Sequence, residues 1–459
     1  MLLLVGIYLS VIAFLCGIIG RFFRAHSDKK PLVQVLVLGD IGHSPRMQYH
    51  SLSLANCGRV SVELIGYRGS HSIESVISHE DICLRHVRQV YIPPSWKVPY
   101  FVYAFVKIVY DFVQVLFILM FGGASIVLVQ TPPAVPSLLV CLIVRYLVGT
   151  KIVLDFHNIT YMHVSHKFSN RLLVWAVCVY ERLVARMCAH ACLCVTKSMR
   201  KFLVGEFGLS NVYTLYDRPG PQFTGKTANR AEWIEKLSTC NGRFENMSST
   251  GQEDKLSPTE KPAHMLVSST SWTIDEDFSI LLAALPEYSA GTTGEKTWML
   301  ITGKGSMHDS FLQAFHKLNL PNIELITGWT RAADYPKILG ICDVGISFHS
   351  STSGLDLPMK IVDFLGAELP VVSIHYEEEL SEITPNIGGT FKNSNELTAL
   401  LLKYIRNEEE RKNLEKSASK WRQTDWKTEW NKIALPVFES LLPRQSRQAR
   451  RRCVRNTHG

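Results

Sequence analysis

Short apolar runs, each ending in turn-forming residues, alternate along the chain with longer stretches of helical periodicity. Runs of the first kind are typical of strands buried on both faces, and stretches of the second kind indicate helices that pack on them. The predicted strands lie at residues 33–40, 61–67, 124–133 and 150–158, and then at residues 264–271, 297–305, 323–329, 343–349 and 369–374. This alternation predicts the α/β class, with parallel sheets covered by helices on both faces.

A polar segment separates the two series of strands. Residues 219–262 are rich in glycine, proline, serine and asparagine and lack apolar periodicity, which is typical of a linker or surface insertion. The chain has 459 residues, too many for one ordinary core, and 46% hydrophobic residues are enough for two. We therefore predict an amino-terminal Rossmann-like domain at 31–218 and a carboxyl-terminal one at 263–435.

The amino terminus has the pattern of a membrane anchor. The first 20 residues carry no charged side chain, and Arg21, Arg24, Lys29 and Lys30 follow closely. Such a run is long enough to cross a bilayer, whereas a cleaved signal peptide has a basic start and a small-residue cleavage site. We predict an uncleaved anchor at 1–22 in a single-pass protein, and the basic flank favours a cytosolic body.

A second apolar region, residues 98–120, is a poor spanning helix because it contains Lys107 and Asp111. Two interpretations stay open. The region is either a core helix of the first domain or an amphipathic surface that enters the membrane interface. In the second case the aromatic side chains at headgroup level are Tyr100, Phe101, Tyr103, Phe105, Tyr110 and Phe112.

Charge and cysteine content argue against only a few classes of binding partner. The formal net charge is +8, but six arginines lie in the tail at 442–459, so the rest of the chain is closer to neutral. This weakens a nucleic-acid interpretation and leaves a diphosphate or an anionic membrane. The cysteines are irregularly spaced, and the cluster of Cys188, Cys192 and Cys194 is predicted to be buried and reduced rather than a metal site.

Candidate site residues of the first half follow two predicted strands. Ligands of open α/β sheets bind outside the carboxyl ends of the strands. Asp40 and Gly42 form a tight turn into a helix, where the backbone and Arg46 are predicted to approach an anion or a sugar on the acceptor side. The alternative is a purely structural turn.

A second polar group ends the fourth predicted strand. Asp155, His157 and Asn158 follow an apolar run at once. A histidine here donates to a phosphate or sugar oxygen or relays a proton, although an isolated histidine is usually structural. The polar neighbours favour the functional interpretation, with Asn158 on the acceptor side.

In the second half, loops after two strands offer phosphate-sized turns. Ser269 and Ser271 supply hydroxyl and amide donors, and Gly303 and Lys304 follow the next strand, where the lysine neutralises part of a diphosphate. The alternative for each is a solvated loop.

The most specific segment is residues 350–372, where Gly354 and Asp356 precede Pro358, Lys360 and Asp363. If a helix starts near Pro358, the lysine and the second aspartate share one face in its first turns. The lysine then pairs with diphosphate, and a carboxylate accepts hydrogen bonds from the ribose hydroxyls.

Seven segments together resemble one family of glycosyltransferases. They are GDIGHSPRMQYHSLSLA, QTPPAVPSLL, DFHNITY, CVTKSM, SSTSWTIDEDFSILLAAL, ITGKG and SGLDLPMKIVDFLGAELPV. In order, and over residues 33 to 435 apart from the polar segment, they are similar to the chitobiosyldiphosphodolichol beta-mannosyltransferases. These enzymes add the first mannose to the dolichol-linked oligosaccharide.

The resemblance implies a GT-B fold, in which two Rossmann-like domains face each other across a cleft. It also implies GDP-mannose as donor, no tightly bound cofactor and a diphosphate-linked di-N-acetylglucosamine lipid as acceptor. An inverting β1,4 transfer at the cytosolic face of the endoplasmic reticulum membrane follows, with other dolichol-pathway glycosyltransferases as candidate partners. Pro358, Lys360 and Asp363 would grip the nucleotide. Because the superfamily often has two glutamates where this chain has Asp356 and Asp363, which of these faces mannose stays open.

The catalytic hypothesis needs one base and several positive groups. Lys304 and Lys360 hold the diphosphate together with the amides of residues 268–271, and Asp40 or His157 is the base. A suitably placed pair of aspartates is absent from the sequence, so no metal is predicted. The alternatives are a related membrane transferase with another sugar nucleotide or lipid acceptor, and a non-catalytic membrane scaffold.

Overall fold

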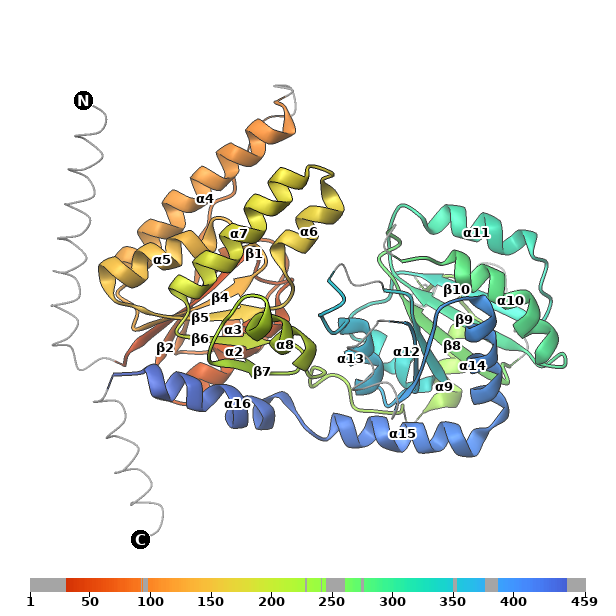
Figure 1. Cartoon of the computed structure of the whole chain (residues 1–459). Coiled ribbons are helices and arrows are strands. Elements are labelled where there is room, and N and C mark those ends of the chain that lie inside the picture. Colours follow the sequence, from red (N-terminus) through yellow and green to blue (C-terminus); the bar gives the residue numbers. More distant parts are fainter. Residues whose placement is uncertain are drawn as a thin grey trace, which may run out of the picture. The chain divides into compact units, whose positions relative to one another are not determined.

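The computed structural model describes residues 30–91, 93, 98–227, 229–240, 242–244, 261–273, 276–349, 353–375 and 387–443. The predicted anchor at 1–22 lies outside these residues, as does the tail beyond Pro443. The chain divides into two compact units. Unit 1 contains the described residues up to Tyr216 and from Lys427 onward, and unit 2 runs from Asp217 to Trp426 (Figure 1).

Unit 1 is built on a seven-stranded parallel sheet of order β3-β2-β1-β4-β5-β6-β7. Its strands are β1 (Leu32–Asp40), β2 (Ser61–Tyr67), β3 (Ile82–Val87), β4 (Ile126–Thr131), β5 (Lys151–Phe156), β6 (Ala191–Cys194) and β7 (Val212–Thr214). The four predicted strands are confirmed, and three others were missed. Two of these, β6 and β7, are very short, and β3 is partly exposed and carries polar residues. The strand that ends in Asp155 is therefore the fifth of the chain and not the fourth.

Helices cover both faces of this sheet. They are α2 (Pro45–Asn56), α3 (Glu74–Ile77), α4 (Tyr100–Gly122), α5 (Ser137–Val148), α6 (Thr160–Lys167), α7 (Arg171–Cys188), α8 (Lys197–Gly205) and α16 (Trp426–Leu441). Local signals set several of their ends. The Asn170 side chain accepts from two amides at the start of α7, and Gly123 ends α4 with a positive φ of 65°.

The second apolar region forms the helix α4, which is packed on one side and exposed on the other, and its entry into the membrane interface stays a prediction. It is long and apolar enough to cross a membrane, and only 22% of its most apolar stretch is buried in the protein. The two charged residues of its packed side are paired with each other, and both Tyr67 and Lys107 donate to the buried Asp111. The other side exposes an apolar and aromatic face that includes Phe101, Phe105 and Phe117.

Unit 2 has a six-stranded parallel sheet of order β10-β9-β8-β11-β12-β13. Its strands are β8 (His264–Ser269), β9 (Thr297–Thr302), β10 (Ile323–Gly328), β11 (Val344–Ser347), β12 (Val371–Ile374) and β13 (Gly388–Phe391). The five predicted strands are confirmed. The sequence did not indicate β13, whose first two residues are glycines without apolar side chains.

The helices of unit 2 are α9 (Arg230–Ser238), α10 (Ser279–Gly291), α11 (His308–Lys317), α12 (Tyr335–Ile341), α13 (Met359–Gly366), α14 (Ser394–Arg406) and α15 (Glu408–Arg422). An aromatic cluster that includes Trp272, Phe278 and Phe348 lies in the core. The helix α9 falls inside the polar segment 219–262 and contacts α12. The described part of that segment is thus packed on unit 2.

The predicted burial of the cysteine cluster is confirmed. Cys188, Cys192 and Cys194 are buried, and each is a free thiol. Burial raises the pKa of Cys188 to about 12, which disfavours the thiolate needed for metal binding or nucleophilic chemistry. These side chains therefore fill the core around β6.

Candidate functional site

Each sheet has one place where the strand order reverses, and ligands of open α/β sheets bind at such switch points. In unit 1 the reversal lies between β1 and β4, and in unit 2 it lies between β8 and β11. Parallel strands bring their carboxyl ends to one edge, so the loops that follow them meet there. The candidate residues of each half are on these loops or next to them.

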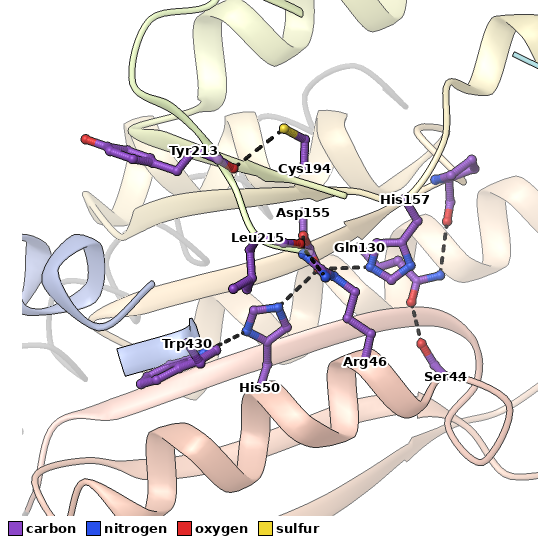
Figure 2. A network of polar contacts seen from close by, with 11 residues as sticks. Ser44, Arg46, His50, Gln130, Asp155, His157, Cys194, Tyr213, Leu215 and Trp430 are labelled. Atoms are coloured by element: carbon purple, nitrogen blue, oxygen red, sulfur yellow. Dashed lines mark hydrogen bonds and ion pairs between the residues drawn. The ribbon is translucent and has the colours of Figure 1, made fainter. Parts of the chain in front are cut away.

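The centre of the unit 1 site is a buried ion pair between Arg46 on α2 and Asp155 at the end of β5 (Figure 2). The guanidinium donates to both carboxylate oxygens, with Nε 2.8 Å from Oδ2 and Nη2 2.9 Å from Oδ1. Its Nη1 donates to the carbonyl of Leu215 at 2.9 Å. The structure thus gives Arg46 internal partners in place of the anion or sugar that the sequence suggested.

Two histidines share the same carboxylate. Nε2 of His157 lies 2.9 Å from Oδ2 of Asp155, and Nε2 of His50 lies 3.3 Å from it. Burial alone would raise the pKa of Asp155, but Arg46 and His157 outweigh it and hold the pKa well below the usual value. Since an ionised carboxylate only accepts, the Nε2 of His157 carries a hydrogen, and Nδ1 is the nitrogen that holds the lone pair in the neutral imidazole.

The exposure of these groups differs in a way that matters for chemistry. Asp155 and His50 are fully buried, whereas 23% of the His157 side chain is exposed. Burial also lowers the pKa of His50. Of the two imidazoles, His157 is therefore the one that a substrate can reach, oriented from behind by a buried carboxylate.

The other predicted base, Asp40, is occupied by the backbone. Its Oδ1 accepts from the amide of Gly42 at 3.0 Å, and its Oδ2 accepts from the amide of Ser70 at 2.8 Å. The bond from Ser70 is the largest cause of a lowered pKa at Asp40. A Cβ on Gly42 would lie 2.5 Å from the Ser70 carbonyl oxygen, so the glycine serves the close approach of these two loops.

The remaining acceptor-side candidate, Asn158, is buried next to His157. Its Oδ1 accepts from the amide of Ile159 at 2.7 Å. The side chain therefore shapes the turn that carries His157 and starts α6.

In unit 2 the residues after β8 surround a buried glutamate. Oε2 of Glu276 accepts from the amide of Ser271 at 2.7 Å and also from the Thr270 hydroxyl. The loop after β9 approaches closely, because a Cβ on Gly303 would lie 1.8 Å from the Thr270 carbonyl oxygen. Gly303 has a φ of 147°, which L side chains rarely adopt. The loops after β8 and β9 are thus in close backbone contact at this end of the sheet.

The predicted helix after Pro358 is confirmed as α13, and Lys360 lies in its first turn. Nζ of Lys360 forms an ion pair with Glu276, whose side chain is almost fully buried. This places the predicted diphosphate-binding cation beside the Ser269–Ser271 loop. The pairing of Lys360 with this glutamate was not predicted from the sequence.

Asp363 lies one turn later and faces the same loop through a tyrosine. Its Oδ2 accepts from the hydroxyl of Tyr335 at 3.3 Å, and that hydroxyl is 2.9 Å from the Ser269 hydroxyl. Burial raises the pKa of Asp363 to about 7. The predicted carboxylate is therefore close to the predicted loop but sits behind Tyr335.

Lys304 and an exposed tryptophan mark the ends of β9 and β10. Nζ of Lys304 lies 5.5 Å from the ring centroid of Trp329, half of whose side chain is exposed. Gly354 has a φ of 66°, and Asp356 follows it before α13 begins. Among the residues that the structure describes, no group of three or more histidines, cysteines and carboxylates could hold a metal ion, and the absence of a metal requirement stays a prediction.

Curated relatives match the chain over nearly its whole length. It is 32% identical over 455 residues to the chitobiosyldiphosphodolichol beta-mannosyltransferase of Candida albicans, a match that covers 95% of this chain and 94% of that one. The Homo sapiens enzyme of the same name is 36% identical over 444 residues, with 88% and 92% covered. The Dictyostelium discoideum one is 33% identical, with 88% and 93% covered. No family model matches the chain.

Solved structures agree on the fold. Sucrose-phosphate synthase from Thermosynechococcus elongatus has a TM-score of 0.62 at 12% identity and covers 92% of this chain and 100% of its own. Anabaena Alr3699/HepE in complex with UDP has a TM-score of 0.61 at 13% identity, with 89% and 100% covered. WaaG, a glycosyltransferase involved in lipopolysaccharide biosynthesis, has a TM-score of 0.56 at 14% identity, with 86% and 95% covered. The predicted GT-B fold is confirmed.

Proposed function

The chain belongs to the chitobiosyldiphosphodolichol beta-mannosyltransferases and is a glycosyltransferase of the dolichol pathway, and from this premise we propose its substrates, its base and its place in the cell. The donor is GDP-mannose. The acceptor is di-N-acetylglucosamine linked through a diphosphate to dolichol, and the product carries a β1,4-linked mannose. The names of relatives from three distant organisms support this assignment.

The proposed reaction is a single displacement with inversion. A hydroxyl oxygen of the acceptor forms a bond to C1 of mannose while the bond from C1 to the phosphate oxygen breaks, and GDP leaves with the electron pair. The hydroxyl proton goes to Nδ1 of His157. The observation that carries this proposal is the Asp155 carboxylate behind Nε2 of His157, since it orients the ring and stabilises the imidazolium that forms.

The proposed donor site lies at the carboxyl end of β8. Lys360 and Lys304 supply positive charge for the diphosphate, and Lys360 lies beside the loop of Ser269 and Ser271 through its pair with Glu276. Because Lys360 is already held by the buried Glu276, its ammonium is positioned before the donor arrives. Asp356 and Asp363 are the candidates for mannose and ribose.

Substitution of the lysine on α13 tests the donor site. A Lys360→Ala variant is expected to lose about 10-fold to 100-fold in kcat/KM for the donor, because a charge-assisted hydrogen bond contributes about 1.5–3 kcal/mol. Lys360→Arg keeps the charge and is expected to recover part of the loss. Lys317→Ala, at the exposed end of α11, is the matched control. Equal donor kinetics in Lys360→Ala and the control would remove Lys360 from the donor site.

An assay with defined substrates tests the function itself. The purified chain is incubated with GDP-mannose and a chitobiosyl diphosphate lipid, and the lipid products are analysed by mass spectrometry. We expect a lipid-linked trisaccharide whose new mannose is removed by a β-mannosidase. Parallel reactions with UDP-glucose or with a lipid monophosphate acceptor represent the related-transferase alternative, and turnover there alone would favour it. No turnover with any donor, in a chain that is folded, would favour a scaffold.

We also propose that unit 1 docks on the endoplasmic reticulum membrane, with the body in the cytosol. The exposed face of α4 continues at the start of α7, where Leu172 and Trp175 are exposed. Tyr100 on α4 contacts Phe168, and Lys167 donates to the Tyr100 hydroxyl at 3.1 Å. An apolar face with aromatic residues and a basic edge is typical of a surface that enters the membrane interface.

The docking face predicts a difference between membrane and soluble acceptors. A double variant, Phe101→Ser with Phe105→Ser, is expected to lower kcat/KM for an acceptor in vesicles roughly tenfold, because each exposed phenylalanine contributes about 1 kcal/mol or more at the interface. The rate with a water-soluble short-chain acceptor should not change. The matched control is Ile77→Ser with Val204→Ser, two exposed apolar residues on α3 and α8. A proportional loss with both acceptors would argue against docking by α4.

A further inference from the structure

A tryptophan of the last helix completes the network around Asp155. Trp430 on α16 is fully buried, and its indole Nε1 donates to Nδ1 of His50 at 2.9 Å (Figure 2). The indole is stacked on Phe438, with ring centroids 5.8 Å apart. Residues 380 positions apart in the chain are therefore in contact, and His50 in turn lies 3.3 Å from the Asp155 carboxylate that holds His157.

The bond from Trp430 constrains the protonation state of His50. An indole nitrogen donates and never accepts, so Nδ1 of His50 must present a lone pair and its hydrogen must be on Nε2, toward Asp155. A second proton could enter only at Nδ1, where it would meet the indole N–H at 2.9 Å. Trp430 thus acts in the same direction as burial, against the imidazolium form of His50.

This effect matters because the two imidazoles compete for one carboxylate. The charged and titratable groups that act on His50 are Asp155 on β5, Arg46 on α2 and His157 after β5. Burial and the charges of Arg46 and His157 disfavour a proton on His50, whereas Asp155 favours one. A cationic His50 would neutralise the negative charge of Asp155, which an imidazolium at His157 needs during the reaction.

We propose that Trp430 is a positioning residue of the transfer reaction, which keeps His50 neutral so that the charge of Asp155 serves His157 alone. This rests on the proposed role of His157 as the base. An ion pair between Glu439, near the carboxyl end of α16, and Arg59, just after α2, helps to hold this helix against unit 1. The last described helix thereby contributes to the chemistry through the bond from Trp430 to His50.

The test is a pH–rate profile in a double-mutant cycle. Trp430→Phe removes the N–H and keeps an aromatic ring on Phe438. We expect the acid limb of kcat/KM to move to lower pH by roughly half a unit to one unit, because a proton on His50 makes protonation of His157 less favourable. In a His50→Gln background, which has no competing imidazole, Trp430→Phe is expected to leave the limb where it is.

Controls separate this role from a structural one. Trp298→Phe, in the core of unit 2, removes another fully buried indole and should leave the profile unchanged. A lower rate at every pH with an unmoved limb, or the same shift with and without His50, would overturn the proposal. A His157→Ala variant in the same series distinguishes a wrong base assignment from a wrong role of Trp430. If it keeps full activity, the proposed base is wrong, and if it is inactive while Trp430→Phe shows no shift, only the role of Trp430 is wrong.

Discussion

A His157→Ala variant is expected to lose about 10²-fold to 10⁴-fold in kcat, the usual contribution of a positioned general base. The reason lies in the geometry. Nε2 of His157 is bound to Asp155 at 2.9 Å, and the ring is the one imidazole of the pair that is partly exposed. The KM for the donor should change little, because His157 is in unit 1 and the proposed donor site is in unit 2. Steady-state kinetics with GDP-mannose and the chitobiosyl lipid measure both parameters.

Two further variants make this result interpretable. His157→Gln keeps a polar side chain but has no group that titrates near neutral pH, so it should be about as inactive as the alanine variant. His316→Ala, on the exposed end of α11, is the matched control and should keep full activity. If Asp40 were the base instead, an Asp40→Asn variant would be inactive and His157→Ala would keep its rate.

The second large effect is expected on stability. An Arg46→Met variant should lower the free energy of unfolding by about 3–5 kcal/mol at pH 7, because breaking a buried ion pair leaves an uncompensated charge. Both side chains are almost fully buried, and the guanidinium has two contacts with Asp155. Denaturant unfolding followed by tryptophan fluorescence measures the change. Lys412→Met removes an exposed pair with Glu408 on α15 and should leave the unfolding midpoint unchanged.

The effect of Arg46→Met has a defined pH dependence. The pKa of Asp155 is held well below its usual value in the folded protein, so its ionisation stabilises the fold above about pH 4, the unfolded value. This contribution disappears as the pH falls through the folded pKa. The difference in stability between the wild type and the variant should therefore be full at pH 7 and become smaller below about pH 4. A constant difference across that range would show that packing, not charge, accounts for the loss.

The site residues show how far local sequence signals reach. The density of Asp155, His157 and Asn158 after an apolar run indicated a special strand end, and Pro358 correctly indicated the start of α13. Arg46 follows a glycine turn, which favoured a ligand-binding interpretation, but its partner lies 109 residues further along. Its position at i−4 from His50 on α2 was the only local hint that both face one partner. Glu276 follows the predicted strand 264–271 closely in the sequence, whereas nothing near Trp430 in the chain points to His50.

What the sequence by itself determined is the α/β class, the nine strands with continuous apolar runs, the family and the loops that carry the candidate chemistry. These depend on short-range patterns, because a buried parallel strand must be apolar along its length and polar residues must follow where it ends. Only the tertiary structure decided which polar groups pair. Arg46 and Lys360, both expected to bind a ligand, are held by the buried carboxylates of Asp155 and Glu276. A buried charge needs a partner, and the packing of distant segments determines which group that is.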